Sequence, residues 1–202
     1  MTGRTCEPGA RLFQLDNERA ISWGDHRPVI DRANATGYDR RMASTLDKVA
    51  LEWQHPGRQY VISTDPARLD LDVIHGVLRE SYWSQGIPME VVRRAIAGSL
   101  VFGVYAVGGS QVGFARVVTD KATFGYLADV FIIAAQRGRG LSKWLMSVIV
   151  EHPELQDLRR WLLATRDAHG LYAHFGFTPL QAPERFMERH DPDVYARTSL
   201  RR

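Results

Sequence analysis

The stretch with the clearest chemical potential is QRGRGLS, residues 136–142, which lies between a strand-like apolar run and a helix-like one. A turn that enters a helix leaves several backbone N–H groups without intrahelical partners. Glycines at 138 and 140 remove the Cβ atoms that would keep a ligand from those groups. The helix dipole, Arg137 and Arg139 favour negative charge at the same place. The pattern predicts an anion site, and the alternative is a turn that only reverses the chain.

Two common phosphate-binding motifs do not match this turn. The dinucleotide fingerprint requires a third glycine where Lys143 stands. The Walker A pattern requires four residues between its first glycine and Gly-Lys, and this spacing is absent as well. The anion is therefore not identified by either motif.

The elements that must position this turn alternate between short strands and helices from Gln59 onward. Strands are expected at residues 59–63, 100–107, 111–118, 124–133, 159–166, 177–180 and 184–189, and helices at residues 65–83, 89–97, 141–149 and 168–175. The run at 159–166 is apolar on both sides, so a central place in the sheet is expected for it. This order of elements predicts one mixed sheet covered by helices on both faces.

Length and punctuation set the expected domain organisation. The chain has 202 residues, which is enough for one well-buried domain and a further stretch. Residues 1–57 contain scattered Gly and Pro and hold no lasting pattern, so we expect a loosely ordered N-terminal extension there. Residues 58–202 are expected to form the domain. Met42 opens a periodic stretch, and we hypothesise that the natural start lies there, with the first 41 residues an over-extended reading frame.

Composition narrows the class of protein. A hydrophobic content of 45% with 24% charged residues is ordinary for a soluble globular protein, and no apolar run is long enough to cross a bilayer. The N-terminus has no apolar signal segment and Cys6 is the single cysteine, so a cytoplasmic location is expected. The net charge of +3 and the pI near 9.2 favour anionic partners. A polyphosphate cofactor and a nucleic acid satisfy that preference equally.

Two motifs give a resemblance to a known family. RGRGLS, residues 137–142, resembles the R/Q-x-x-G-x-G/A motif of the GNAT superfamily of N-acetyltransferases, and it follows its strand and opens its helix as in that family. ATRDAHGLYAHFGFTPL, residues 164–180, resembles the family's second motif, with Ala168, Tyr172, Gly176 and Phe177 in place. The resemblance covers roughly Gln59 to Arg189. It implies an α/β fold: a single GNAT-like domain whose mixed central sheet is splayed between its fourth and fifth strands.

The resemblance also implies a cofactor and the residues that bind it. Acetyl-coenzyme A would lie in the splayed gap as co-substrate, and its pantetheine arm would pair with the backbone at Ile132 and Ile133. No metal is implied. Ser142, Ala134 and Thr165 depart from the residues usual in the family at their positions, which are Gly or Ala, a bulge-forming proline, and asparagine. The amides expected to hold the pyrophosphate are those of Arg137, Gly138, Arg139, Gly140, Leu141 and Ser142.

Two residues are candidates for the chemistry of acetyl transfer, which needs a neutral amine and a proton for the departing thiolate. Tyr172 matches the family tyrosine that protonates the coenzyme A sulfur, and the alternative is a core residue on the apolar face of its helix. Asp129 lies in an apolar strand, where an uncompensated carboxylate would be costly. We consider it a base or an amine-orienting group, and the alternative is a buried partner for Arg116 or for a backbone amide.

The acceptor is expected to enter between the first two helices. In the loop SYWSQGIP, Tyr82 and Trp83 line the expected mouth, unless they only cover the sheet edge. Glu80, at the end of the first helix, is a weaker candidate, and a solvated surface residue is its alternative.

These observations predict an acetyl-coenzyme A-dependent N-acetyltransferase that acts on a primary amine of a small molecule or peptide, by direct transfer in a ternary complex. The alternative from another class is a coenzyme A-binding sensor or partner module without turnover. Nucleic-acid binding through RGRG and the C-terminal arginines ranks last, and neither a nucleic-acid nor a membrane partner is expected. The run ERFMER, residues 184–189, is a candidate edge strand that would pair across a homodimer.

Overall fold

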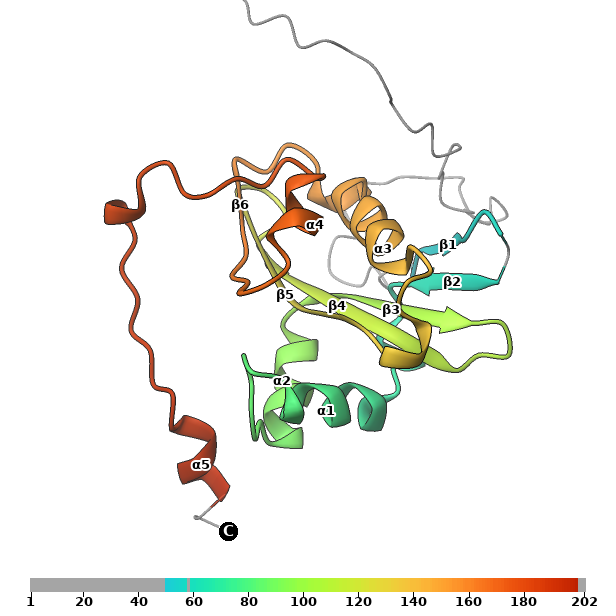
Figure 1. Cartoon of the computed structure of the whole chain (residues 1–202), viewed down its shortest axis with the longest axis horizontal. Coiled ribbons are helices and arrows are strands. Elements are labelled where there is room, and N and C mark those ends of the chain that lie inside the picture. Colours follow the sequence, from blue (N-terminus) through green and yellow to red (C-terminus); the bar gives the residue numbers. More distant parts are fainter. Residues whose placement is uncertain (1–49, 58, 200–202) are drawn as a thin grey trace, which may run out of the picture.

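The computed structural model describes residues 50–57 and 59–199 of the chain (Figure 1). The predicted extension therefore lies outside the described residues, except for residues 50–57. The strands are β1 (Glu52–Gln54), β2 (Tyr60–Ser63), β3 (Leu100–Ala106), β4 (Gln111–Thr119), β5 (Phe124–Ile132) and β6 (Arg160–Leu162). The α-helices are α1 (Leu71–Glu80), α2 (Met89–Ala97), α3 (Leu141–Val150), α4 (His169–Ala173) and α5 (Val194–Ser199). Short 3-10 helices lie at η2 (Pro66–Arg68), η3 (Ala134–Gln136), η4 (Pro153–Leu155) and η5 (Pro183–Arg185).

The six strands form one sheet in the order β1-β2-β3-β4-β5-β6. Neighbours are antiparallel up to β5, and β5 and β6 are parallel. Helices α3 and α4 lie over one face of the sheet, and α1 and α2 lie over the other (Figure 1). The predicted mixed α/β fold is confirmed.

Each face of the sheet has its own hydrophobic core. On the α3 side, Phe102, Val117 and Leu127 pack with Leu145 and other apolar residues of α3. On the other side, a smaller core joins apolar residues of α1 and α2 to the sheet residues Val101, Phe114 and Phe131. The apolar residues at helical spacing in residues 141–149 therefore form a buried helix face, because six of the ten residues of α3 are buried.

A bulge in β5 changes which face its side chains occupy. Phe114 pairs with Phe131, but Arg116 pairs with Ala128, so β5 has one more residue than β4 over this stretch. Asp129 supplies the extra residue in a left-handed backbone conformation, with φ of 55°. This conformation is uncommon outside glycine, and Asp and Asn tolerate it better than most residues. As a result, Phe131 belongs to the α1 side although Leu127 belongs to the α3 side.

Three expectations about the last strands are wrong. β6 comprises only Arg160–Leu162 and lies at the edge of the sheet, because no later strand returns to cover it. Residues 177–180 form no strand, and Pro179 lies within this run. Residues 184–189 are not a strand either, because Pro183 opens a 3-10 turn and the chain then runs outward. The expected edge strand for a dimer is therefore an exposed arm.

The sheet begins earlier than the expected boundary between residues 57 and 58. β1 pairs with β2, and its Trp53 is buried in the larger core. Residues 50–57 thus contribute to the domain, although we expected them in the extension. Of the stretch that begins at Met42, residues 42–49 lie outside the described residues. Its last positions are described and include Glu52 and Trp53 of β1.

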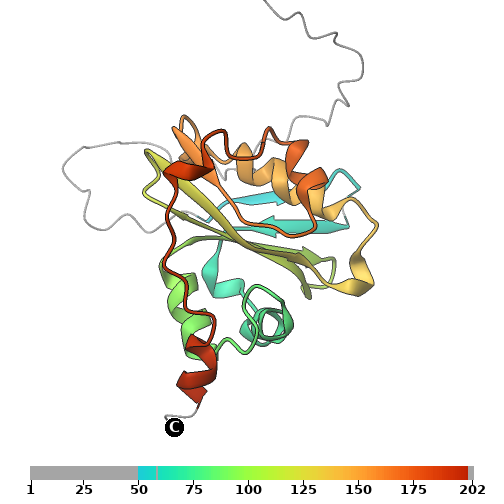
Figure 2. The same cartoon turned by 60° about the vertical axis from the view of Figure 1, so that its left-hand side comes forward.

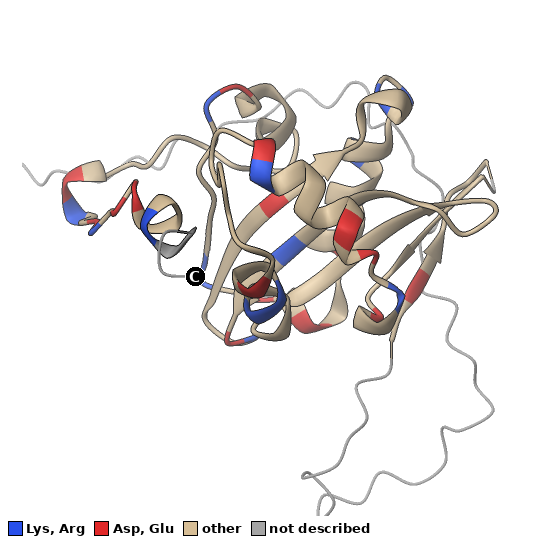
Figure 3. Cartoon of the chain, turned by 90° about the horizontal axis from the view of Figure 1, so that it is seen from below, with Lys and Arg blue, Asp and Glu red and all other residues tan. Residues whose placement is uncertain are grey.

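Charged residues of both signs are spread over the described part of the chain (Figure 3). Basic and acidic residues are interspersed along the helices and loops in the view from below (Figure 3). None of the helices in the described ranges has the length and apolar character that crossing a bilayer requires.

The buried His152 is expected to make stability depend on pH. It is 2% exposed and packs against the rings of Trp53 and Phe102. Burial, partly offset by Glu154, lowers the pKa of His152 from 6.5 to about 4. The unfolded chain therefore binds the proton more tightly, so stability is fully present above pH 6.5 and falls as the pH decreases toward 4. The loss amounts to about 3 kcal/mol by linkage.

We expect urea unfolding of His152→Asn to show a smaller loss of stability between pH 6.5 and 4 than wild type. Asparagine retains an acceptor for the Glu154 amide, which bonds His152 Nδ1 at 3.2 Å. The exposed His190→Asn is the control and should follow wild type. Parallel stability curves for His152→Asn and wild type would contradict the assignment.

Candidate active site

The turn before α3 presents a run of free backbone amides. Gly138 and Gly140 both have φ of 77°, and a Cβ at either position would meet no atom within 4 Å. The first helical bond is donated by Trp144 to the Gly140 carbonyl at 3.1 Å. The amides of residues 138–143 donate no hydrogen bond to any described residue. These amides, together with the positive end of the helix dipole, suit an anionic group.

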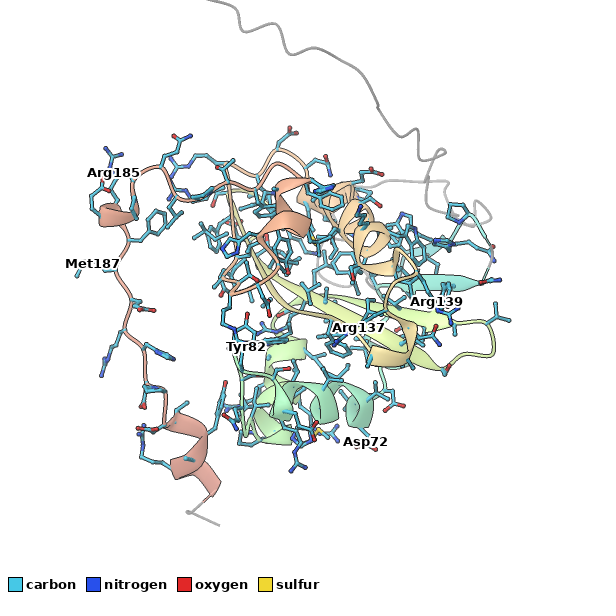
Figure 4. All side chains as sticks on the ribbon, in the orientation of Figure 1. Asp72, Tyr82, Arg137, Arg139, Arg185 and Met187 are labelled. Atoms are coloured by element: carbon cyan, nitrogen blue, oxygen red, sulfur yellow. The ribbon has the colours of Figure 1, made fainter. Side chains whose placement is uncertain are left out.

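The two arginines of the turn play different parts. The Nε of Arg137 donates to the Ile132 carbonyl at 3.1 Å, so this side chain ties the turn back to the end of β5. Arg139 is exposed and lies beside Arg137 at the same end of the sheet (Figure 4). Gln136, just before the turn, accepts a hydrogen bond from the Tyr60 hydroxyl at 2.8 Å. Arg139 is thus the arginine that remains free to reach a ligand.

Of the two residues expected to pair with the pantetheine arm, Ile132 and Ile133, only Ile132 presents its backbone groups on the side of β5 away from β4. The Ile133 amide donates to the Val112 carbonyl at 2.9 Å, so it is occupied by β4. Because amides alternate in direction along a strand, Ile132 faces the side away from β4. Its carbonyl already accepts from Arg137, and its N–H remains directed to the open side.

β5 loses β6 as its partner after Tyr126, as the splayed sheet requires. Their paired residues are Phe124 with Arg160, Gly125 with Trp161 and Tyr126 with Leu162. Beyond Tyr126, β5 continues to Ile132 without a partner in β6. The gap therefore opens between the fourth and fifth of the strands expected from the sequence, which are β5 and β6.

Tyr172 lies on α4 and lines a pocket together with β6 and the residues that follow it. It is 9% exposed, packs in the larger core and contacts the ring of Phe177. Burial, followed by the nearby Tyr82 and Asp167, raises the pKa of Tyr172 from 10.0 to about 12. The phenol therefore keeps its proton at neutral pH.

Asp129 forms an ion pair at the bulge of β5. Its Oδ2 accepts from Arg116 Nε at 2.5 Å, and its Oδ1 accepts from Trp83 Nε1 at 3.2 Å. The pair is largely buried, with side-chain exposures of 19% for Arg116 and 10% for Asp129. Arg116 also donates to Ser99 Oγ at 3.3 Å. The partner that we gave as the alternative for Asp129 is present, and the same carboxylate also contacts the expected acceptor mouth through Trp83.

The loop between α1 and α2 is joined to the loop between β6 and α4. Tyr82 accepts a hydrogen bond from the Arg166 amide at 3.0 Å, and the Arg166 guanidinium stacks over the Tyr82 ring at 3.9 Å. Tyr82 and Trp83 meet edge to face, with 5.0 Å between ring centroids. Tyr82 lies where the α1–α2 loop approaches the sheet (Figure 4). Through these contacts the α1–α2 loop spans the gap between β5 and β6.

Glu80 lies apart from this arrangement. It is exposed at the end of α1, and its side chain forms no hydrogen bond or ion pair with any described residue. Two residues that sequence reasoning did not select do belong to the arrangement: Arg166, next to Tyr82, and Ser99, next to Arg116. Arg116 was named only as a partner. An arginine within the apolar run QVGFARVV was the available signal for its buried position.

Comparison with known proteins agrees with this geometry. The family model described as an acetyltransferase (GNAT) domain matches residues 98–179. A Gibberella zeae protein named as a candidate acetyltransferase is 32% identical over 133 residues, which cover 56% of this chain and 75% of that protein. The crystal structure of a candidate acetyltransferase of the GNAT family from Xanthomonas campestris is 51% identical, has a TM-score of 0.66, and aligns over 68% of this chain and 96% of that one. A candidate acetyltransferase from Deinococcus radiodurans shares the fold, with a TM-score of 0.53 at 19% identity over 71% of this chain and 96% of that one.

The splayed sheet and the turn before α3 thus define an acyltransferase-type α/β protein. The chain belongs to the GNAT family of acetyltransferases.

The buried ion pair leads to a stability prediction. Arg116→Met leaves Asp129 buried without its counter-ion, and we expect a loss of about 3 kcal/mol in the free energy of unfolding. Lys121→Met breaks an exposed pair with Glu154, and we expect it to cost less than about 1 kcal/mol. Urea denaturation measures both. Adding Asp129→Asn to Arg116→Met should restore part of the loss, because the neutral amide needs no counter-ion. Equal losses for Arg116→Met and Lys121→Met would contradict the prediction.

Proposed function

We propose that the chain transfers the acetyl group of acetyl-coenzyme A to a primary amine, directly and within a ternary complex. The observation that carries the proposal is the run of free amides at residues 138–143, located where the open edge of β5 ends. Tyr172 and Asp129 are proposed to act at the same gap. A surface turn with a purely structural role would not require this combination of free donors, an unpaired strand edge and a protonated phenol.

The proposed cofactor site fits the residues present. Open space at Gly138 and Gly140 allows a phosphate to approach the amides of residues 138–142, and Arg139 adds a charged donor. The Arg137 amide, which we also expected to bind the pyrophosphate, instead donates to the Ala134 carbonyl at 3.2 Å. Ile132 offers its N–H on the open side of β5, whereas Ile133 would contribute its side chain because its amide is bonded to Val112. Acetyl-coenzyme A would supply an activated thioester carbon and a thiolate leaving group.

Tyr172 is proposed to donate the proton that the departing sulfur requires. A thiol has a pKa near ~8.5, so its thiolate leaves without much help, and a protonated phenol nearby lowers the barrier further. In the transfer, the amine nitrogen forms a bond to the carbonyl carbon and the carbon–sulfur bond breaks. The phenol proton goes to sulfur, and the proton lost by the amine returns to the phenolate through solvent.

Asp129 is proposed to orient the amine. Each carboxylate oxygen already accepts one hydrogen bond, from Arg116 or from Trp83, and retains lone-pair capacity for an amine N–H. Arg116 fixes the direction of the carboxylate through its hydrogen bond to Oδ2. A primary amine with a pKa near ~10.4 is mostly protonated at pH 7, so a carboxylate next to the site also favours its capture before it loses the proton.

The acceptor is proposed to be a small-molecule or peptide amine that enters past Tyr82 and Trp83. These rings are 44% and 45% exposed, and they lie on the loop that crosses the gap. Glu80, at the end of α1, would lie at the outer edge of this entrance and attract a cationic amine.

Binding of the cofactor is expected to depend on Gly140. We expect isothermal calorimetry to give micromolar-range affinity for acetyl-coenzyme A with wild type and no measurable binding with Gly140→Asp, which places an anion among the free amides. Gly108→Asp is the matched control, because Gly108 also has positive φ, 102°, but lies in the turn between β3 and β4. Circular dichroism checks that both variants are folded.

Absence of binding by the wild type would contradict the cofactor site. Binding without acetylation of any amine in a broad screen would instead support a coenzyme A-binding module without turnover.

Replacement of Tyr172 should reduce turnover but not cofactor affinity. We expect Tyr172→Phe to lower kcat by about 100-fold at every pH between 6 and 10, because the phenol remains protonated throughout this range. For the same reason, ionisation of Tyr172 should cause no loss of wild-type activity below about pH 11.

Tyr105→Phe serves as the control, because it removes another buried hydroxyl, on β3, that has no hydrogen-bond partner among the described residues. A kcat of Tyr172→Phe equal to that of wild type would show that Tyr172 is only a core residue.

A further inference from the structure

An arginine at the expected acceptor entrance is held in place but has no acidic partner among the described residues. The guanidinium of Arg166, in the loop between β6 and α4, stacks on the Tyr82 ring with 3.9 Å between its Cζ and the ring centroid. The Tyr82 hydroxyl accepts from the Arg166 amide at 3.0 Å, so the backbone of Arg166 is fixed by the same residue. Helices α1 and α2 lie on one face of the sheet and α3 and α4 on the other in both views (Figures 1 and 2), so this contact joins loops from opposite faces.

The stacked guanidinium keeps its hydrogen-bonding edge free. Stacking uses the face of the guanidinium plane, whereas the N–H groups lie within that plane. The side chain is exposed, and no residue in the described ranges accepts a hydrogen bond from it or pairs with its charge. Asp167, the next residue, is exposed as well and lies beyond ion-pair distance of the guanidinium. Arg166 therefore presents oriented donors to a ligand at the entrance.

Arg68 shows how the same arrangement is completed elsewhere in the chain. Its guanidinium stacks on the Tyr105 ring at 4.4 Å, and its edge donates to the carboxylate of Glu52. Among the described residues, no carboxylate takes this place at Arg166, although its stacking is closer. A guanidinium matches a carboxylate or a phosphate in both geometry and charge, so a ligand anion would complete the arrangement.

Asp129 and Arg166 are connected through one aromatic pair. The indole Nε1 of Trp83 donates to Asp129 at 3.2 Å, and the Trp83 and Tyr82 rings meet with 5.0 Å between centroids. Tyr82 in turn carries the Arg166 guanidinium. The carboxylate and the guanidinium are thus separated by two contacting rings, which places both within reach of one small molecule. The exposed parts of the two rings offer apolar surface to the portion of that molecule between its charged ends.

We propose that the acceptor is an amine that also bears a carboxylate or a phosphate, with its anionic group bound by Arg166 and its nitrogen directed to Asp129. The nitrogen end rests on the proposed function, because Asp129 acts on the amine only if the chain transfers acetyl groups. The anionic end rests on the stacked guanidinium alone. Amino acids and amino phosphates meet this requirement, whereas alkylamines and polyamines carry no group for the guanidinium.

Amines that differ only at the end far from the nitrogen test the proposal. The anionic probes are 6-aminohexanoate and 6-aminohexyl phosphate, and the uncharged-end probes are 6-aminohexanamide and hexylamine. We expect wild-type kcat/KM for the better anionic probe to exceed that for either uncharged-end probe at least about 10-fold, as a hydrogen bond to a charged group provides. Whichever anionic probe is favoured identifies the anion that the site takes.

Variants of Arg166 show whether the guanidinium causes this preference. In Arg166→Gln the ratio should fall to about 1, because glutamine has no charge to pair with the anion, and Arg166→Lys should retain part of it. Arg160→Gln is the matched control and should keep the wild-type ratio, because Arg160 also stacks on a ring, that of Phe186, but lies at the start of β6. The wild-type preference should also weaken between about 0.05 and 0.5 M NaCl, since salt screens an exposed charge.

Ligand-observed NMR measures binding of the same probes and separates the anion site from acetyl transfer. Tighter binding of the anionic probes by at least about 10-fold, lost in Arg166→Gln, would support the anion site even if no amine is acetylated and the proposed function fails. Acetylation of hexylamine as efficient as that of both anionic probes would overturn the anion site and leave the proposed function intact. A preference that persists in a folded Arg166→Gln variant, or equal binding of all probes without turnover, would overturn it as well.

Discussion

The candidate site depends above all on the ion pair between Arg116 and Asp129 at the bulge of β5. The extra residue reverses the alternation of the strand, so that Leu127 and Ile132, five positions apart, share the core on the α3 side. Without it, Ile132 would face α1 and the turn after β5 could not lead into α3 with its amides exposed. Arg116 balances the charge of the residue that makes the bulge, which is otherwise costly in a largely buried position.

The bulge also accounts for the split in the sheet. β5 and β6 pair only before the bulge, from Phe124 to Tyr126. β5 then continues toward the turn at residues 137–140 with β4 as its neighbour but without β6. One edge of β5 is thereby free beside the amides that precede α3. A regular strand would keep its neighbour along its whole length and leave no room for a ligand between them.

Loops from both faces of the sheet meet at the opening. Trp83, in the loop on the α1 side, donates a hydrogen bond to Asp129. Tyr82, in the same loop, accepts a hydrogen bond from the amide of Arg166, which lies in the loop before α4. Asp129 holds the bulge and the loop through these contacts, and the amine-orienting role that we propose for it uses the same carboxylate. The two interpretations that the sequence left open for Asp129 are compatible, because a carboxylate has more acceptor capacity than its two partners use.

The sequence alone determined the local features: the helix at residues 141–149 from its apolar spacing, the amide-rich turn from its glycines, and the α/β order of elements. Such features depend on neighbours within a few residues. Tertiary structure decided the bulge at Asp129, the joining of Tyr82 to Arg166, the edge position of β6 and the outward path of residues 184–189. Each depends on residues distant in the chain, and the apolar run at 159–166 shows why: the pattern indicates burial, but it does not indicate which part of the fold provides that burial.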